Sequence, residues 1–299
     1  MLDYEGLAAV AAVVREGSFE RAAQALGVTP SAVSQRVRAL EERVGSALIR
    51  RARPCTPTAI GAQLCAHVER VRLLEGEMIA SLPALSGSAA EEGPATLRVA
   101  VNADSLSTWF IEAVAQFTRR NPALIDIVTD HEGETAERLR SGEVLAAVTA
   151  DAPQVPGCRM IELGSLRYVA TASPDFMRKW FAGGVDAAAL ASAPVIRFDR
   201  KDQIQAQWAA KTVGTILAAP THWVPTTHGG MDAMVAGLGW GVNPLALGRE
   251  MIARGKLVEI VPDNAIDVPL QWQHARVGAR LLDQLTKAVV AAARRALVR

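Results

Sequence analysis

Arginine is concentrated in one short part of the sequence. Between residues 36 and 53 there are six arginines against two glutamates, although the whole chain has 32 basic and 31 acidic residues and a net charge of +1. A guanidinium group is well suited to phosphates and base edges because it is planar and donates several hydrogen bonds in a fixed geometry. A solvated face is the ordinary explanation of such a cluster, so a nucleic-acid function requires a matching motif around it.

Three predicted helices would carry these arginines. Residues 4–16 and 19–26 have apolar residues at helical spacing, and a glycine follows each segment. A third helix is expected to begin at Pro30 with Thr29 as its N-cap, because proline at the first helical position loses no hydrogen bond there. The buried stripe of this helix is expected to comprise Val33, Val37, Leu40 and Val44.

The opposite face of the third helix is polar. It presents Ser31, Ser34, Gln35 and Arg38. Two short helices joined by a glycine-containing turn, the second with such a face, are typical of a helix-turn-helix that enters the DNA major groove. There glutamine can bind adenine and arginine can bind guanine, while hydroxyls bind phosphate. A helical hairpin in an all-α core explains the periodicity equally well.

The sequence itself resembles the winged helix-turn-helix of LysR-type transcriptional regulators. The similarity lies in residues 18–41, SFERAAQALGVTPSAVSQRVRALE, in the wing segment GSALIRR (45–51), and in TPTAIG (56–61). The family commonly has Arg-Thr where this chain has Arg51-Ala52. The resemblance implies binding to double-stranded operator DNA through Ser18, Thr29, Pro30, Ser31, Ser34, Gln35, Arg36, Arg38, Arg50, Arg51 and Arg53.

A long helix is predicted from Thr58 to about Leu82. Its apolar residues recur in a heptad-like pattern: Leu64, Val71, Met78 and Leu85, with Val68, Leu74 and Leu82 between them. Such a stripe needs a partner, which is either its own domain or a second copy. The resemblance implies antiparallel pairing with the linker helix of a second subunit, in a homodimer and a homotetramer. Residues 83–94 are rich in Gly, Ser, Ala and Pro and are interpreted as a hinge.

These features divide the chain into three expected parts. Residues 1–58 are the DNA-binding domain, 59–94 the linker helix and hinge, and 95–299 an effector-binding domain. In the last part, apolar runs alternate with helical segments, which predicts an α/β fold with a parallel sheet. The runs are 97–101, 124–129, 144–149, 168–172, 195–198, 222–224 and 270–273. The resemblance implies a periplasmic-binding-protein-like fold of two α/β subdomains, I (about 95–165 and 270–299) and II (about 166–269).

Polar residues follow the ends of several predicted strands, where ligands bind in such folds. Hydroxyl and N–H groups near Ser105 and Thr226 suit a carboxylate, and an acid such as Asp104 suits an α-ammonium. Helix caps and surface carboxylates explain each residue singly, but they explain the whole set poorly. The candidate effector-binding residues are Asn102, Ala103, Asp104, Ser105, Leu106, Ser107, Asp130, His131, Glu132, Asp199, Thr226, Thr227 and His228.

Within the family, the chain resembles the ArgP/LysG branch most in VNADSLSTW (101–109) and GLGWG (237–241). That resemblance implies sensing of L-lysine or L-arginine and control of an amino-acid exporter gene. If either amino acid is the ligand, we expect Glu132 or Asp199 to hold its distal cation. RNA polymerase would be a partner if the protein activates transcription. Two departures, His131 and His228, replace acids of the branch and so leave a different small effector open.

Other classes of protein fit less well. The sequence has no Walker loop, G-x-S-x-G, H-E-x-x-H or G-x-G-x-x-G motif and no metal-ligand spacing, so we expect no enzyme activity, metal or cofactor. Three scattered cysteines and no long apolar run indicate a cytoplasmic protein that does not cross a membrane. A solute-binding protein would not carry the helix-turn-helix, and a redox sensor would need a second cysteine near Cys158.

Overall fold

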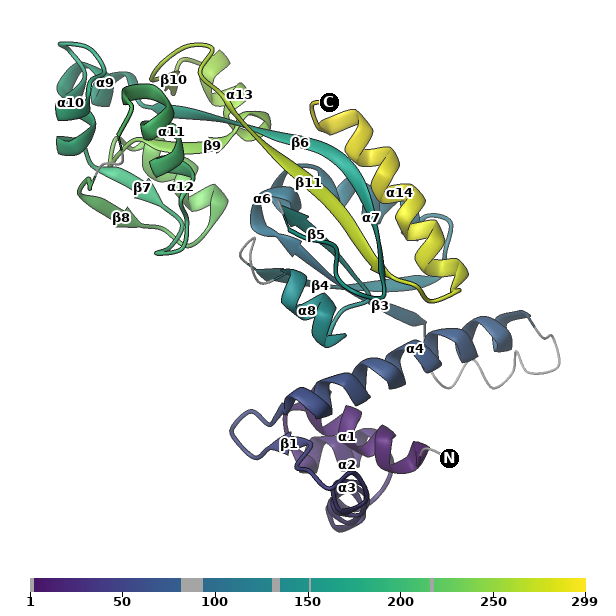
Figure 1. The fold of residues 1–299 in the computed structure, drawn as a ribbon. Helices are drawn as coiled ribbons and strands as arrows, with labels where there is room; N and C mark the ends of the chain where they lie inside the picture. The colour runs from purple at the N-terminus through teal and green to yellow at the C-terminus, as the bar shows by residue number, and fades with distance from the viewer. Residues whose placement is uncertain (1–2, 82–93, 131–134, 151, 216–217) are drawn as a thin grey trace.

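Three parts follow one another in the computed structural model, which describes residues 3–81, 94–130, 135–150, 152–215 and 218–299. A small helical domain at the amino terminus continues into the long helix α4 (Ala59–Ser81), and an α/β region of two lobes follows (Figure 1). None of the described helices is both long enough and apolar enough to cross a membrane.

The amino-terminal domain contains the three predicted helices and a two-stranded wing. The elements are α1 (Tyr4–Glu16), α2 (Phe19–Ala25), α3 (Pro30–Val44), β1 (Ile49–Arg50) and β2 (Thr56–Pro57). Side-chain caps fix the helix starts as expected: the hydroxyl of Ser18 accepts from Arg21 N at 3.1 Å, and that of Thr29 accepts from Ala32 N at 3.2 Å. The predicted stripe of α3 is buried except at its end. Val44, the last residue of α3, is 39% exposed.

The start of α4 is fixed tightly against the wing. The hydroxyl of Thr58 donates to the carbonyl oxygen of Ala47 at 2.8 Å and accepts from Gly61 N at 3.1 Å. A Cβ atom at Gly61 would lie only 2.0 Å from the carbonyl oxygen of Leu48, so glycine alone permits this approach. These contacts with the residues next to the wing therefore fix the direction in which α4 leaves the amino-terminal domain.

One face of α4 docks on the effector domain of its own chain. Leu73 is 4% exposed and belongs to the main core of that domain, and a Cβ atom at Gly142 would lie 2.4 Å from Ala66 Cβ. The carboxylate of Glu77 accepts hydrogen bonds from Arg280 N at 3.0 Å and from Leu281 N at 2.8 Å. The spacing of 66, 73 and 77 places these three residues along one helical stripe.

The predicted heptad stripe of α4 is divided between two environments. Val68 is buried in the amino-terminal core and Leu64 packs against it. In contrast, Leu74 and Met78 are 43% and 55% exposed. Leu82 and Leu85, the last two residues of the predicted stripe, lie outside the described residues. Among the predicted stripe residues that the structure describes, the exposed ones therefore lie in the carboxy-terminal half of α4.

The first lobe is built on a sheet whose strand order begins with β10 (Val258–Glu259), a strand of the second lobe, and continues β6-β11-β5-β3-β4. Its strands are β3 (Ala95–Asn102), β4 (Ala123–Asp130), β5 (Ala146–Ala150), β6 (Cys158–Ala172) and β11 (Ile266–Ala275). Its helical segments are α6 (Ala103–Ser105), the π-helix η2 (Leu106–Phe110), α7 (Ile111–Thr118), α8 (Thr135–Ser141) and α14 (Arg280–Ala296).

The sheet is mixed, whereas the sequence predicted a parallel sheet. Strand β3 is parallel to β4 and β5, but β11 is antiparallel to β5 and β6. The long strands β6 and β11 pass from one lobe to the other (Figure 1). The sequence predicted only 168–172 of β6, because its first part alternates exposed residues such as Arg159 and Glu162 with apolar ones and forms no apolar run.

The second lobe also contains a parallel strand pair. Its strands are β7 (Val195–Arg197), β8 (Thr221–Trp223), β9 (Gly241–Pro244) and β10 (Val258–Glu259), and its helices are α9 (Pro174–Trp180), α10 (Ala187–Ser192), α11 (Ile204–Val213), α12 (Thr227–Val235) and α13 (Leu245–Ala253). Strands β7 and β8 are parallel, while β9 and β10 pair antiparallel with β6. The sequence did not predict the short strands β9 and β10.

Candidate DNA-binding face and effector cleft

Helix α3 exposes the side chains that the sequence assigned to DNA. Ser31, Gln35 and Arg38 are exposed, and Ser34 is half-buried. Arg38 forms an ion pair with Glu42 one helical turn away, with Nε–Oε1 at 2.9 Å. Both side chains are well exposed, and exposed pairs of this kind contribute little free energy. Arg38 therefore remains available to a polyanion.

Arg36 has a partner within the domain. Its guanidinium pairs with the carboxylate of Glu5 at 2.9 Å and is half-buried. This ion pair joins α3 to α1. The DNA contact expected of Arg36 from the sequence stays a prediction beside this ion pair.

The wing presents three exposed arginines, Arg50, Arg51 and Arg53. The guanidinium carbon of Arg51 lies 5.0 Å from the centre of the Phe19 ring, a cation–π contact with the first residue of α2. The carboxylate of Glu41 accepts from the backbone N–H groups of Leu48 at 2.8 Å and Ile49 at 3.3 Å. These bonds fix the wing to the end of α3.

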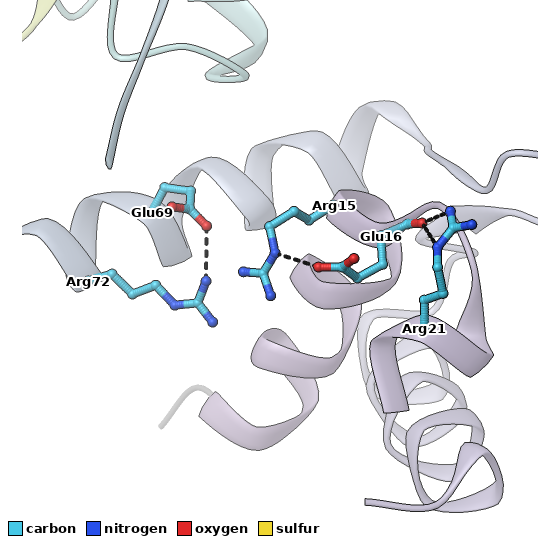
Figure 2. A network of polar contacts seen from close by, with 5 residues as sticks. All are labelled: Arg15, Glu16, Arg21, Glu69 and Arg72. Carbon is cyan, nitrogen blue, oxygen red and sulfur yellow. Dashed lines mark hydrogen bonds and ion pairs between the residues drawn. The ribbon is translucent and has the colours of Figure 1, made fainter. Parts of the chain in front are cut away.

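Other arginines of the domain are engaged within the chain near α1 and α4. Figure 2 shows Arg15 paired with Glu16 at 3.0 Å and Arg72 paired with Glu69 at 3.2 Å. Arg21 donates from Nε to the carbonyl oxygen of Glu16 at 2.8 Å, where α1 ends (Figure 2). A cation near the carboxyl end of a helix stabilises that helix, as Arg15 and Arg21 do at the end of α1. All three arginines therefore have partners within the chain.

A cavity of about 650 Å³ lies between the two lobes. Its walls include Asn102, Ala103 and Asp104 after β3, and Thr226 and Thr227 at the start of α12. These five residues, predicted from distant parts of the sequence, are thus brought together at the carboxyl ends of strands.

Asp104 is an acid of the cavity whose pKa is raised. Its carboxylate accepts hydrogen bonds from Tyr168 Oη at 2.8 Å and from Thr227 Oγ1 at 2.7 Å. Burial raises the pKa of Asp104, and the nearby negative charge of Asp202 raises it further, while the two hydrogen bonds act in the opposite direction. A bound cation would relieve this cost because it stabilises the carboxylate form.

The other predicted residues near β3 do not line the cavity. Ser105 is fully buried and its N–H group donates to Asn102 Oδ1 at 3.2 Å, so this N–H is already occupied. Leu106 packs against the main core, and Ser107 is half-buried outside the cavity lining. The residues of this segment that face the cavity are Asn102, Ala103 and Asp104.

Asp199 and His228 also lie outside the cavity lining. The carboxylate of Asp199 accepts from Lys201 N at 2.7 Å and from Asp202 N at 3.0 Å, which organises its own loop. His228 is exposed on α12. His131 and Glu132 lie outside the described residues, and for Asp130 the structure gives only its position at the end of β4, in register with Asn102.

Sequence reasoning missed several polar residues that line the cavity, among them Tyr168, Arg197 and Asp202. Arg197 ends β7, so the rule that selected strand ends was sufficient to find it. The carboxylate of Asp202 accepts from Phe198 N and Ile204 N, each at 3.1 Å. A third acid of the lining, Asp267, is already neutralised by two bonds from Arg167 at 2.8 and 2.7 Å, which lower its pKa.

Two of the three cysteines, Cys65 and Cys158, have thiols with raised pKa values. Burial raises the pKa of the Cys65 thiol to about 11 and also raises that of Cys158. Since the thiolate is the reactive species, both thiols are poor nucleophiles. This electrostatic environment argues against a redox-sensing cysteine.

Family models match both halves of the chain. Residues 4–62 match the bacterial regulatory helix-turn-helix protein model of the lysR family, and residues 90–298 match the LysR substrate binding domain. The chain belongs to the LysR family. The LysR-type fold expected from the sequence is thus confirmed, with the mixed sheet as its correction.

Full-length similarity to ArgP and LysG proteins places this LysR-type transcriptional regulator with them. It is 44% identical to ArgP of Pseudomonas aeruginosa (strain UCBPP-PA14) over 299 residues, 100% of this chain and 98% of that protein. It is 40% identical to LysG of Mycobacterium tuberculosis (strain ATCC 25618 / H37Rv) over 292 residues, 98% and 94% of the two chains. These relatives are regulators, so the expectation of a non-enzyme is confirmed.

Solved structures of the same type superpose over the whole chain. ArgP from Mycobacterium tuberculosis has a TM-score of 0.84 at 39% identity, covering 100% of this chain and 99% of that one. LysG from Corynebacterium glutamicum, solved with bound effector Arg, has a TM-score of 0.75 at 36% identity and covers 100% of both chains.

Proposed function

We propose that this LysR-family regulator senses a basic L-amino acid, arginine or lysine, in the cleft and thereby adjusts transcription of an amino-acid exporter gene. The observation that carries the proposal is the pair of cavity acids Asp104 and Asp202. Neither forms an ion pair within the described part of the chain, whereas Asp267 is neutralised by Arg167. A ligand that carries a cationic group, such as the α-ammonium of an amino acid, is therefore favoured there. The choice of a basic amino acid is supported by the arginine bound to the similar LysG structure.

The DNA-binding part of the proposal rests on the exposed faces of α3 and the wing. Gln35 and Arg38 would contact base edges, and Arg50, Arg51 and Arg53 would contact the phosphate backbone. The functional units would be residues 1–58, 59–94 and 95–299, acting on DNA in the cytoplasm. RNA polymerase would be a further partner where the protein activates transcription.

Assembly through α4 completes the proposal. The exposed surfaces of Leu74 and Met78 would pair with the linker helix of a second subunit, and effector domains would join dimers into a tetramer. A charged substitution, Leu74→Lys, should weaken the dimer because it places a cation in an apolar seam. Light scattering at micromolar concentration measures this, and a monomeric unsubstituted protein would contradict it.

A thermal-shift screen against all amino acids tests the effector. A ligand at 100 times its dissociation constant stabilises the folded state by about 2.7 kcal/mol, which shifts the melting temperature measurably. We expect L-arginine and L-lysine to give the largest shifts. Binding of a neutral or acidic amino acid without arginine or lysine would replace the proposed effector and leave the family assignment unchanged.

A further inference from the structure

The cavity contains cationic as well as acidic groups, and one cation has an unusual environment. Arg197, at the carboxyl end of β7, lines the cavity. It donates from Nη2 to the carbonyl oxygen of Asp202, and its Nε atom is buried without a hydrogen-bond partner. Arg197 forms no ion pair with any residue that the structure describes. A buried donor without a partner is costly, so an acceptor from a ligand would be stabilised here.

The guanidinium of Arg197 is also held in place. It lies over the ring of Trp223, 5.4 Å from the ring centre, and Trp223 is its direct neighbour in the parallel pairing of β7 with β8. Arg200 lies over the same ring at 5.2 Å but does not line the cavity. Stacking on an aromatic face orients a planar guanidinium. Trp223 is therefore a positioning residue for Arg197.

Two neutral donors near the cleft are already used. The N–H group of Ser105 is bonded to Asn102, and the hydroxyl of Thr227 donates to Asp104. The hydroxyl oxygen of Thr226 accepts from Gly229 N at 3.1 Å as the N-cap of α12, so its O–H group can still donate a neutral hydrogen bond. Arg197 adds a charge-assisted donor for a ligand carboxylate in the same cavity.

We propose that Arg197 binds the α-carboxylate of the effector, while Asp104 and Asp202 bind its α-ammonium. Asp202 is linked to both other groups, because its backbone carbonyl accepts from Arg197 and its charge acts on Asp104. One cation and two acids thus line the same cavity, and a zwitterionic head group requires charges of both signs. This assignment rests on the proposed function only in that an amino acid occupies the cleft.

The test compares a ligand with and without its carboxylate. Calorimetry on the full-length protein measures affinity for L-arginine and for agmatine, which is arginine lacking the carboxylate. The variants are R197Q and, as a matched control, R200Q. A further variant, R197K, keeps the positive charge and serves if R197Q fails to fold. We expect R197Q to weaken L-arginine binding roughly ten- to a hundredfold and to leave agmatine binding unchanged. R197K should lower the affinity for L-arginine more than the affinity for agmatine, and R200Q should change neither affinity.

The outcomes separate this proposal from the effector assignment. If the unsubstituted protein binds arginine and R197Q keeps the same preference for arginine over agmatine, the role of Arg197 is overturned and the proposed function stands. If R200Q loses as much affinity for L-arginine as R197Q does, the role of Arg197 is overturned as well. If only a neutral amino acid binds, the basic effector is overturned, and the same comparison with the amine of that amino acid decides the role of Arg197. Absence of binding by every amino acid overturns both.

Discussion

Asp104 accepts a hydrogen bond from Thr227 across the cleft, with Oδ1 and Oγ1 separated by 2.7 Å. Asp104 follows β3 in the first lobe, and Thr227 is the first residue of α12 in the second. The bond therefore joins the lobes directly through a buried acid. Because a ligand ammonium would compete for the same carboxylate, ligand binding and the contact between the lobes are linked at this atom pair.

The pKa of Asp104 predicts a pH dependence of stability. Burial raises this pKa above 3.8, so the folded protein binds the proton more tightly than the unfolded chain does. The stabilisation is complete below pH 3.8 and is lost as the pH rises through the raised pKa. We expect the unfolding free energy of the unsubstituted protein to fall, relative to Asp104→Asn, as the pH increases through this interval. Urea denaturation of both proteins over a pH series checks this, and a difference independent of pH would contradict it.

Two glycines of α4 predict opposite effects of the same substitution. Gly61→Ala should destabilise the amino-terminal domain by about 1–3 kcal/mol, because its Cβ atom would lie 2.0 Å from the Leu48 carbonyl oxygen. Gly76 has no atom within 4 Å of such a Cβ, so Gly76→Ala should stabilise the helix by up to about 1 kcal/mol. Thermal unfolding measures both. Similar stability of the two variants would show that the close contact is not a constraint.

The sequence predicted local features better than distant contacts. Ser18 and Thr29 marked the helix starts correctly because capping is decided within four residues. It did not predict that Arg36 pairs with Glu5, since both a DNA contact and an ion pair suit an arginine on a helix. In the cleft, the choice between Asp199 and Asp202 depends on which acid organises the loop and which faces the cavity. Residue types three positions apart do not contain that information.

The contact between α4 and α14 predicts a stability effect across domains. The N-cap position of α14 is Ala279, which has no side-chain acceptor, and Glu77 bonds the first two N–H groups of the helix instead. Glu77→Ala should cost about 0.5–2 kcal/mol, as the loss of a cap does. Glu75→Ala, an exposed change on the same helix, is the control. Chemical denaturation followed by tryptophan fluorescence measures the difference, and equal midpoints for the two variants would contradict the capping role.

The DNA-binding face predicts two kinds of loss. Gln35→Ala should weaken binding to the specific operator by about 1–3 kcal/mol and relax specificity, because an exposed amide on α3 contacts a base edge in the proposed complex. Arg50→Ala, in the wing, should weaken specific and random duplexes alike and reduce the salt dependence by about one unit of slope. Arg36→Ala should instead lower the stability of the domain, since it breaks the ion pair with Glu5. Fluorescence anisotropy with both duplexes at several salt concentrations separates these cases. An equal loss of specific and random binding in Gln35→Ala would assign that residue to the phosphate backbone and leave the base contacts to other side chains of α3.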